Sequence, residues 1–222
     1  MSERHRLACR DDLGLPGIGV EPAFAIGQRA LLLPEPDGCV MWDCVPLATP
    51  DAVDYVRSKG GLKAIAVSHP HYYGAVADWS DAFGGVPIHL HDDDRAWITR
   101  PLRSIVPWSG ESHRLSDGML LLRTGGHFAG ATVLHWRAAA QGRGALFTGD
   151  IATVTMDRRF VSFMYSYPNY IPLNAEAVRR IERVVAPLAF DRIHGAWWDR
   201  NIESDAKAAF DASVRRYLAA IS

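Results

Sequence analysis

Apolar positions along the chain fall into short strand-like runs and longer stretches with helical spacing. Two apolar runs, residues 24–33 and 39–44, flank the turn sequence PEPDG and predict a β-hairpin. Thr49 and Pro50 form a helix start, and the Gly60-Gly61 pair ends that helix. The rest of this half predicts strands at 64–68 and 86–90 and helices at 74–83 and 92–100.

The second half contains three consecutive strand-like runs between Gly118 and Gly149, namely MLLLRT, ATVLHWR and GALFTG. A helix capped by Asn174, a short strand FDRI at 190–193 and a final helix from about Ser204 to Ala220 follow. Strands bracketed by helices in both halves predict an α/β (α+β) fold with two packed sheets and helices outside. We expect one domain over residues 1–222, with residues 1–20 as an irregular lead-in.

Charge and composition narrow the range of partners. The 222 residues include 24 basic and 25 acidic side chains, a net charge of −1, so we expect neither nucleic acid nor a membrane as partner. The N-terminus has no apolar run, no stretch approaches the ~20 apolar residues of a membrane span, and the three cysteines have no C-x-x-C spacing. These features predict a cytoplasmic protein.

The nine histidines are the main chemical signal, because several stand at the ends of predicted strands. His69 and His71 follow a buried strand, and residues i and i+2 of an extended segment point to the same side. His127 lies in the glycine-rich turn TGGHFAG, Asp150 ends the strand ALFTG, and His194 ends the strand FDRI. Three histidines and one carboxylate are a suitable ligand set for zinc.

This ordered set of motifs resembles the metallo-β-lactamase superfamily. The resemblance runs from the Phe24 hairpin to His194, and it implies a four-layer αββα sandwich of two mixed β-sheets flanked by helices. It also implies a metal cleft that usually holds two zinc ions and sometimes iron or manganese. In this sequence it assigns His69, His71 and His127 to the first metal, Asp150 to a bridging position and His194 to the second metal.

The chain departs from the family pattern H-x-H-x-D-H, because Tyr73 and Gly74 stand where two ligands of the second metal belong. Asp150 and His194 alone are fewer ligands than zinc ordinarily takes, so we expect one tightly bound ion. Tyr73 is then expected to face the metal, where its phenol could donate to a bound oxyanion, act as a weak acid–base group or, rarely, ligate iron. Asp78, one helical turn beyond Gly74, either replaces the lost carboxylate or is solvated, and solvation is the simpler interpretation.

The resulting hypothesis is a metal-dependent hydrolase that uses a metal-activated water on a small ester, thioester, lactone or related substrate. Asp150 and Tyr73 are its candidate catalytic residues. The alternative is a non-hydrolytic metal-binding or redox member of the same fold with a degenerate second metal site.

Other residues have simpler interpretations. His89 and His91 share one face of a strand and could form a second metal pair, but a strand end before an acidic helix start is favoured. His5, His113 and His135 are expected to be solvated or in the core. The aromatic residues of 160–170 and 197–198 suit either a wall for an apolar substrate or ordinary core packing.

Overall fold

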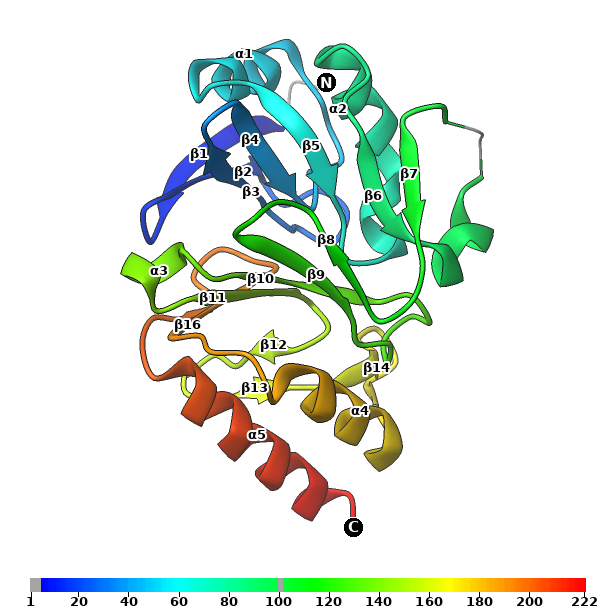
Figure 1. Cartoon of the computed structure of the whole chain (residues 1–222), viewed down its shortest axis with the longest axis vertical. Coiled ribbons are helices and arrows are strands. Elements are labelled where there is room, and N and C mark those ends of the chain that lie inside the picture. Colours follow the sequence, from blue (N-terminus) through cyan, green and yellow to red (C-terminus); the bar gives the residue numbers. More distant parts are fainter. Residues whose placement is uncertain (1–4, 100–101) are drawn as a thin grey trace. The chain divides into compact units, whose positions relative to one another are not determined.

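The structure, a computed structural model, describes residues 5–99 and 102–222 (Figure 1). The chain divides into two compact units, Met1–Trp108 and Ser109–Ser222, and each contains one large mixed β-sheet with helices. These two mixed sheets confirm the predicted fold class. The single domain over 1–222 stays a prediction.

The sheet of the N-terminal unit has seven strands within the described residues, in the order of the chain. Its first four strands pair antiparallel and its last four pair parallel, with helices in the parallel connections. The strands are β1 (Arg6–Asp12), β2 (Leu15–Glu21), β3 (Ala30–Glu35), β4 (Gly38–Trp42), β5 (Leu62–Ala66), β6 (Ile88–His91) and β7 (Ile105–Trp108). The helices are α1 (Pro50–Ser58), the 3-10 helix η1 (Pro70–Ala75), α2 (Val76–Ala82) and the 3-10 helix η2 (Asp92–Trp97).

The prediction of an irregular lead-in over residues 1–20 is wrong from Arg6 onward, because β1 and β2 form an antiparallel hairpin there. Residues 1–4 lie outside the described residues. Leu13 and Gly14 have φ values of 54° and 90°, the two positive values that a tight hairpin turn requires. The Gly14 amide donates a hydrogen bond to the Asp11 carboxylate at 2.8 Å. Gly14 therefore lies in the turn, and Gly17 and Gly19 lie in a strand whose Ile18 is fully buried.

The strand predicted over 24–33 begins later than expected. Gly27 has a φ of 71°, and its amide donates to the Phe24 carbonyl at 3.0 Å, so residues 24–27 form a turn. The strand itself starts at Ala30, and it pairs with β4 in the predicted hairpin.

The C-terminal unit has a six-stranded sheet in the order β17-β16-β11-β10-β9-β8, all antiparallel except for the parallel pair β11–β16. Figure 1 shows α4 and α5 side by side in this unit, and their apolar faces share one core with the sheet. The sheet strands are β8 (Ser112–Arg114), β9 (Met119–Arg123), β10 (Thr132–Trp136), β11 (Ala145–Gly149), β16 (Arg192–Gly195) and β17 (Asn201–Ile202). The remaining elements are β12 (Thr153–Val154), β13 (Val161–Ser162), β14 (Met164–Ser166), β15 (Ile171–Pro172), α3 (Ala139–Gly142), α4 (Ala175–Val185) and α5 (Ala206–Ala220).

Two helix starts confirm the predicted caps. The Thr49 hydroxyl accepts from the Ala52 amide at the start of α1, and the Asn174 side chain accepts from the Ala177 amide at 2.9 Å at the start of α4. None of the helices within the described part of the chain has the length and apolar character needed to cross a membrane.

A buried ion pair holds the first hairpin to the sheet of the N-terminal unit. The Arg29 Nε atom donates to the Asp12 carboxylate at 2.6 Å, and the two side chains are 1% and 3% exposed. Burial lowers the pKa of the Arg29 guanidinium, and the charge of Asp12 opposes this shift. An exposed pair, Arg10 and Glu21, lies on the same hairpin.

Replacing one partner of the buried pair leaves a charge without compensation in a dry environment. We expect Asp12→Ala to reduce the free energy of unfolding by about 3–5 kcal/mol. Glu21→Ala is the matched control, and it should cost at most about 1 kcal/mol because its pair is exposed. Urea unfolding measures both changes, and equal losses would contradict the structural role of the buried pair.

Candidate metal centre

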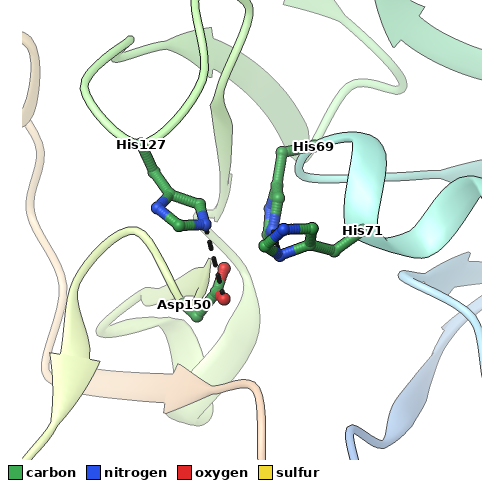
Figure 2. Close-up of side chains that lie close together, drawn as sticks. All are labelled: His69, His71, His127 and Asp150. Carbon is green, nitrogen blue, oxygen red and sulfur yellow. Dashed lines mark hydrogen bonds and ion pairs between the residues drawn. The ribbon is translucent and has the colours of Figure 1, made fainter. Parts of the chain in front are cut away.

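His69 and His71 lie where β5 gives way to η1 in the N-terminal unit. Pro70 is the first residue of η1, and a proline keeps the preceding residue out of the helical region. His69 is accordingly extended, with φ −173° and ψ 176°, while His71 lies in the first turn. Their facing nitrogens, His69 Nε2 and His71 Nδ1, are 3.1 Å apart (Figure 2). His69 is buried and His71 is exposed.

Apart from His71, the His69 ring contacts its neighbours Ser68 and Tyr72. The Ser68 hydroxyl lies 2.9 Å from His69 Nδ1, so its oxygen can accept a hydrogen bond from Nδ1–H, and the lone pair is then on Nε2. The Ser68 amide in turn donates to the buried Asp43 carboxylate at 2.7 Å. The Tyr72 ring packs edge-on against His69 and is 1% exposed, so it belongs to the core of this unit.

His127 and Asp150 form a second pair, within the C-terminal unit. His127 follows Gly125 and Gly126, whose φ values are 66° and 92°. A Cβ on Gly126 would lie 3.0 Å from the Leu173 side chain, so both backbone angle and space favour glycine there. Asp150 follows the last residue of β11, and the His127 Nε2 atom lies 3.7 Å from its carboxylate oxygen (Figure 2). Both side chains are 3% exposed.

The tautomer of His127 follows from its backbone partner. Its Nδ1 atom lies 3.1 Å from the Met164 carbonyl oxygen. Since a carbonyl oxygen only accepts hydrogen bonds, Nδ1 carries the proton in the neutral ring, and Nε2 carries the lone pair that a metal needs. This lone pair is on the nitrogen that faces Asp150.

The donor spacing within each pair fits a metal ion. Two ligand atoms that are each about 2.0–2.1 Å from a tetrahedral ion lie about 3.4 Å apart. The observed separations of 3.1 Å and 3.7 Å bracket this value. Imidazole and carboxylate donors suit zinc and also iron and manganese, so each pair is chemically suited to half of a metal site.

Tyr73 lies along a cavity of the N-terminal unit and is half-buried. Burial raises the pKa of its phenol well above the usual range, and the charges of Asp94 and Asp43 add to the shift. This environment favours the neutral, protonated phenol. Asp78 is exposed on α2, in agreement with the simpler, solvated interpretation.

His194 lies on β16 in the C-terminal unit, in register with Phe147 of β11. The two rings stack, with centroids 4.7 Å apart and planes 7° apart, and His194 is 2% exposed. Asp150 comes three residues after Phe147, beyond the end of the strand. The assignment of His194 to a second metal stays a prediction.

Two further histidines, His91 and His135, form hydrogen bonds with the backbone. His91 Nδ1 accepts from the Asp93 amide at 3.1 Å, as expected for a strand end before an acidic helix start. His135 is buried on β10, and its Nε2 atom lies 2.8 Å from the Ala189 carbonyl oxygen.

Sequence reasoning missed how the aromatic segment 160–170 supports Asp150. The Tyr167 hydroxyl donates to the Asp150 carbonyl at 2.8 Å and also contacts the Thr153 hydroxyl. Burial raises the pKa of Tyr167 above its usual range, so it stays a donor. The Tyr167 ring packs edge-on 5.9 Å from His127. The aromatic content was visible in the sequence, but these hydrogen bonds have no local pattern.

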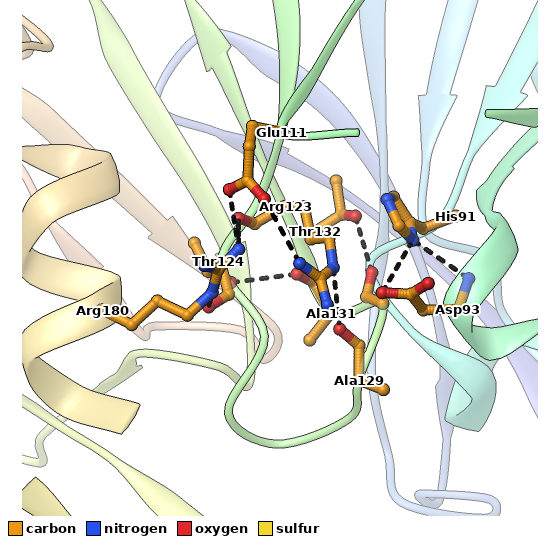
Figure 3. A network of polar contacts seen from close by, with 10 residues as sticks. His91, Asp93, Glu111, Arg123, Thr124, Ala129, Ala131, Thr132 and Arg180 are labelled. Carbon is orange, nitrogen blue, oxygen red and sulfur yellow. Dashed lines mark hydrogen bonds and ion pairs between the residues drawn. The ribbon is translucent and has the colours of Figure 1, made fainter. Parts of the chain in front are cut away.

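Two arginines hold the turn that carries His127, another feature without a sequence signal (Figure 3). Arg180 on α4 donates to the Thr124 carbonyl at 3.1 Å and to the Glu111 carboxylate at 2.7 Å. Arg123 donates to the same carboxylate at 3.3 Å and to the Ala129 carbonyl at 3.1 Å. Both sides of the turn are therefore fixed to one cluster of charges.

Removing Arg180 should loosen this turn. The amides of Thr124 and Gly125, which donate to the Ala131 carbonyl at 2.8 and 3.0 Å, report on it. In Arg180→Ala we expect their hydrogen exchange to be about 10–100-fold faster, because hydrogen bonds from a charged group contribute roughly 1.5–3 kcal/mol. Exposed Arg179 provides the control Arg179→Ala, which should leave both rates unchanged. Unchanged rates in Arg180→Ala would contradict the supporting role.

Known proteins resemble this chain both in sequence and in fold. The "uncharacterized protein YmaE" of Bacillus subtilis (strain 168) is 44% identical over 213 residues, which are 96% of this chain and 77% of YmaE. No protein-family model matches the chain.

Several solved structures share its fold. VMB-1 superposes with a TM-score of 0.69 at 15% identity and covers 100% of both chains. The metallo-β-lactamase DIM-1 gives 0.66 at 12% identity, with 96% of this chain and 95% of DIM-1 covered. A B3 metallo-β-lactamase with an active-site glutamic acid gives 0.62 at 20% identity, with 92% and 86% covered. At these identities the likeness shows the fold, which is that of the metallo-β-lactamases.

Proposed function

Because the chain belongs to one family with YmaE and has the fold of the metallo-β-lactamases, we propose that it is a metal-dependent hydrolase of small molecules. The observation that carries this proposal is that two pairs of side chains each have the spacing and orientation of metal ligands. We propose that the two pairs bind one ion together. The ligand set is His69, His71, His127 and Asp150.

Zinc is the proposed ion, and the same imidazole and carboxylate donors also suit iron or manganese. When bound, such an ion supplies a Lewis acid that polarises a carbonyl or phosphoryl oxygen and lowers the pKa of a coordinated water. The proposed substrates are esters, thioesters, lactones or related small molecules. The balanced charge of the chain supports a small-molecule partner over nucleic acid or an anionic membrane.

The protein groups have separate proposed roles. Asp150, fixed through its carbonyl by Tyr167, uses its carboxylate to accept a proton from the attacking water and to orient it. Tyr73 keeps its proton because of its raised pKa, and its Oη atom donates a hydrogen bond to the substrate. His127 offers Nε2 to the proposed ion, because its Nδ1–H donates a hydrogen bond to the Met164 carbonyl.

The alternative function is a non-hydrolytic metal-binding or redox protein of the same fold. The replacement of the family's Asp and His by Tyr73 and Gly74 favours it. A panel of ester, thioester, lactone and phosphodiester substrates separates the two, since turnover of any of them that requires the metal excludes the alternative.

We also propose a cytoplasmic location, in agreement with the free thiols Cys9, Cys39 and Cys44.

The ligand assignment predicts the effect of removing single imidazoles. His69→Ala, His71→Ala and His127→Ala should each lower zinc affinity by more than the roughly 10–100-fold cost of losing an outer-shell partner. Each variant should stay folded, because both units have apolar cores of their own. Elemental analysis after dialysis and thermal melting measure the two effects.

His89→Ala is the matched control, since His89 lies on β6 outside the proposed ligand set. Its metal content should equal that of the unmodified protein. The assignment is wrong if purified protein carries no metal and added zinc changes neither its metal content nor its melting temperature.

The number of bound ions is a separate prediction. We expect metal content to saturate near one ion per chain, because the second site of the family lacks two of its ligands here. The double substitution Tyr73→Asp with Gly74→His should raise it toward two, and a Cβ at Gly74 meets no atom within 4 Å. Titration with zinc followed by elemental analysis measures this, and two tightly held ions in the unmodified protein would refute it.

A further inference from the structure

A cavity of about 240 Å³ opens against η1 in the N-terminal unit. Its lining includes Tyr73 and Gly74, the two residues at which the chain departs from the family pattern. These residues follow His71 directly in η1. One side of the cavity is therefore formed by the same short helix that carries the proposed metal ligand His71.

The walls of this cavity are mostly apolar. Leu90 comes from β6 and Ile105 from β7. Trp97 is the last residue of η2, and Leu102 lies shortly before β7. Trp97 is 58% exposed, although it is a large apolar side chain that burial would stabilise. Besides Tyr73, the polar side chain in the lining is that of Thr99. Such a lining favours an apolar group with one or two hydrogen bonds at its edge.

The lining of the cavity disfavours an anionic ligand, because none of its described side chains is cationic. Asp94 and Asp43 are 1% and 2% exposed, and both act electrostatically on Tyr73. A carboxylate or phosphate in this cavity would lose its hydration without gaining a cationic partner from the described lining residues, which is unfavourable. The volume also lies below the ~300–1,000 Å³ of pockets that enclose whole drug-sized ligands. The cavity suits an uncharged part of a larger molecule.

We propose that this cavity binds an uncharged aryl or short alkyl group of the substrate, beside the His69–His71 pair. As a statement about the substrate, it rests on the proposed function. Where the family pattern supplies ligands for a second metal, this chain has the phenol of Tyr73 and the open space at Gly74. The assignment makes neutral aryl or alkyl compounds the substrate class for this chain.

The test uses a neutral probe and its anionic counterpart, 4-fluorobenzyl alcohol and 4-fluorobenzoate, with binding followed by fluorine NMR on the protein as purified. The unmodified protein should bind the alcohol saturably and the benzoate at least tenfold more weakly. Gly74→Leu should weaken alcohol binding at least tenfold, because its side chain enters space in which a Cβ meets no atom within 4 Å. Asp81→Leu adds the same side chain to the exposed face of α2 and is the control with unchanged binding.

Trp97→Ala provides a second variant, which removes an exposed wall and should also weaken binding of the alcohol. The proposal is overturned if the alcohol does not bind, if the benzoate binds as well, or if both cavity variants bind like the control. Metal content is measured on the same samples. If the protein binds no metal but Gly74→Leu still weakens binding of the alcohol, the proposed function is refuted and the cavity remains a binding site.

Discussion

A neutral imidazole has one proton to donate and one lone pair to offer, and the candidate metal ligands depend on this constraint. A ring binds a metal only if its other nitrogen keeps the proton, and a buried proton needs an acceptor. In His127 that acceptor is the Met164 carbonyl oxygen. In His69 the corresponding partner is the Ser68 hydroxyl, which is itself placed by the bond from the Ser68 amide to Asp43.

Much of the local structure serves to place these acceptors. The β14–β15 segment supplies the Met164 carbonyl and, through Tyr167, a hydrogen bond to the Asp150 backbone. Arg180 and Arg123 hold the glycine turn before His127, where side chains other than hydrogen would meet Leu173. In the N-terminal unit, Pro70 forces His69 into an extended conformation. Each pair is thus fixed by residues that do not themselves carry a metal ligand.

Elements with a strong local signal could be predicted from the sequence. Helix α1 has its Thr49 cap, α4 its Asn174 cap, and β9 to β11 are continuous apolar runs. The β1–β2 hairpin was missed, because glycine and proline in β2 hid a strand whose pairing is set by tertiary packing. The residues of the candidate site stood in recognisable motifs at strand ends. Their supports did not, because a backbone carbonyl such as that of Met164 and a distant side chain such as Arg180 leave no pattern near the residue they hold.

The central proposal is that His69, His71, His127 and Asp150 bind one metal ion together, through three imidazoles and one carboxylate and without sulfur. X-ray absorption at the zinc edge of the purified, zinc-loaded protein measures this most directly. The account predicts scattering from three imidazole rings with zinc–nitrogen distances of about 2.0–2.1 Å and one or two further oxygen ligands. A zinc–sulfur shell near about 2.3 Å, or a spectrum with fewer than three imidazoles, would contradict it.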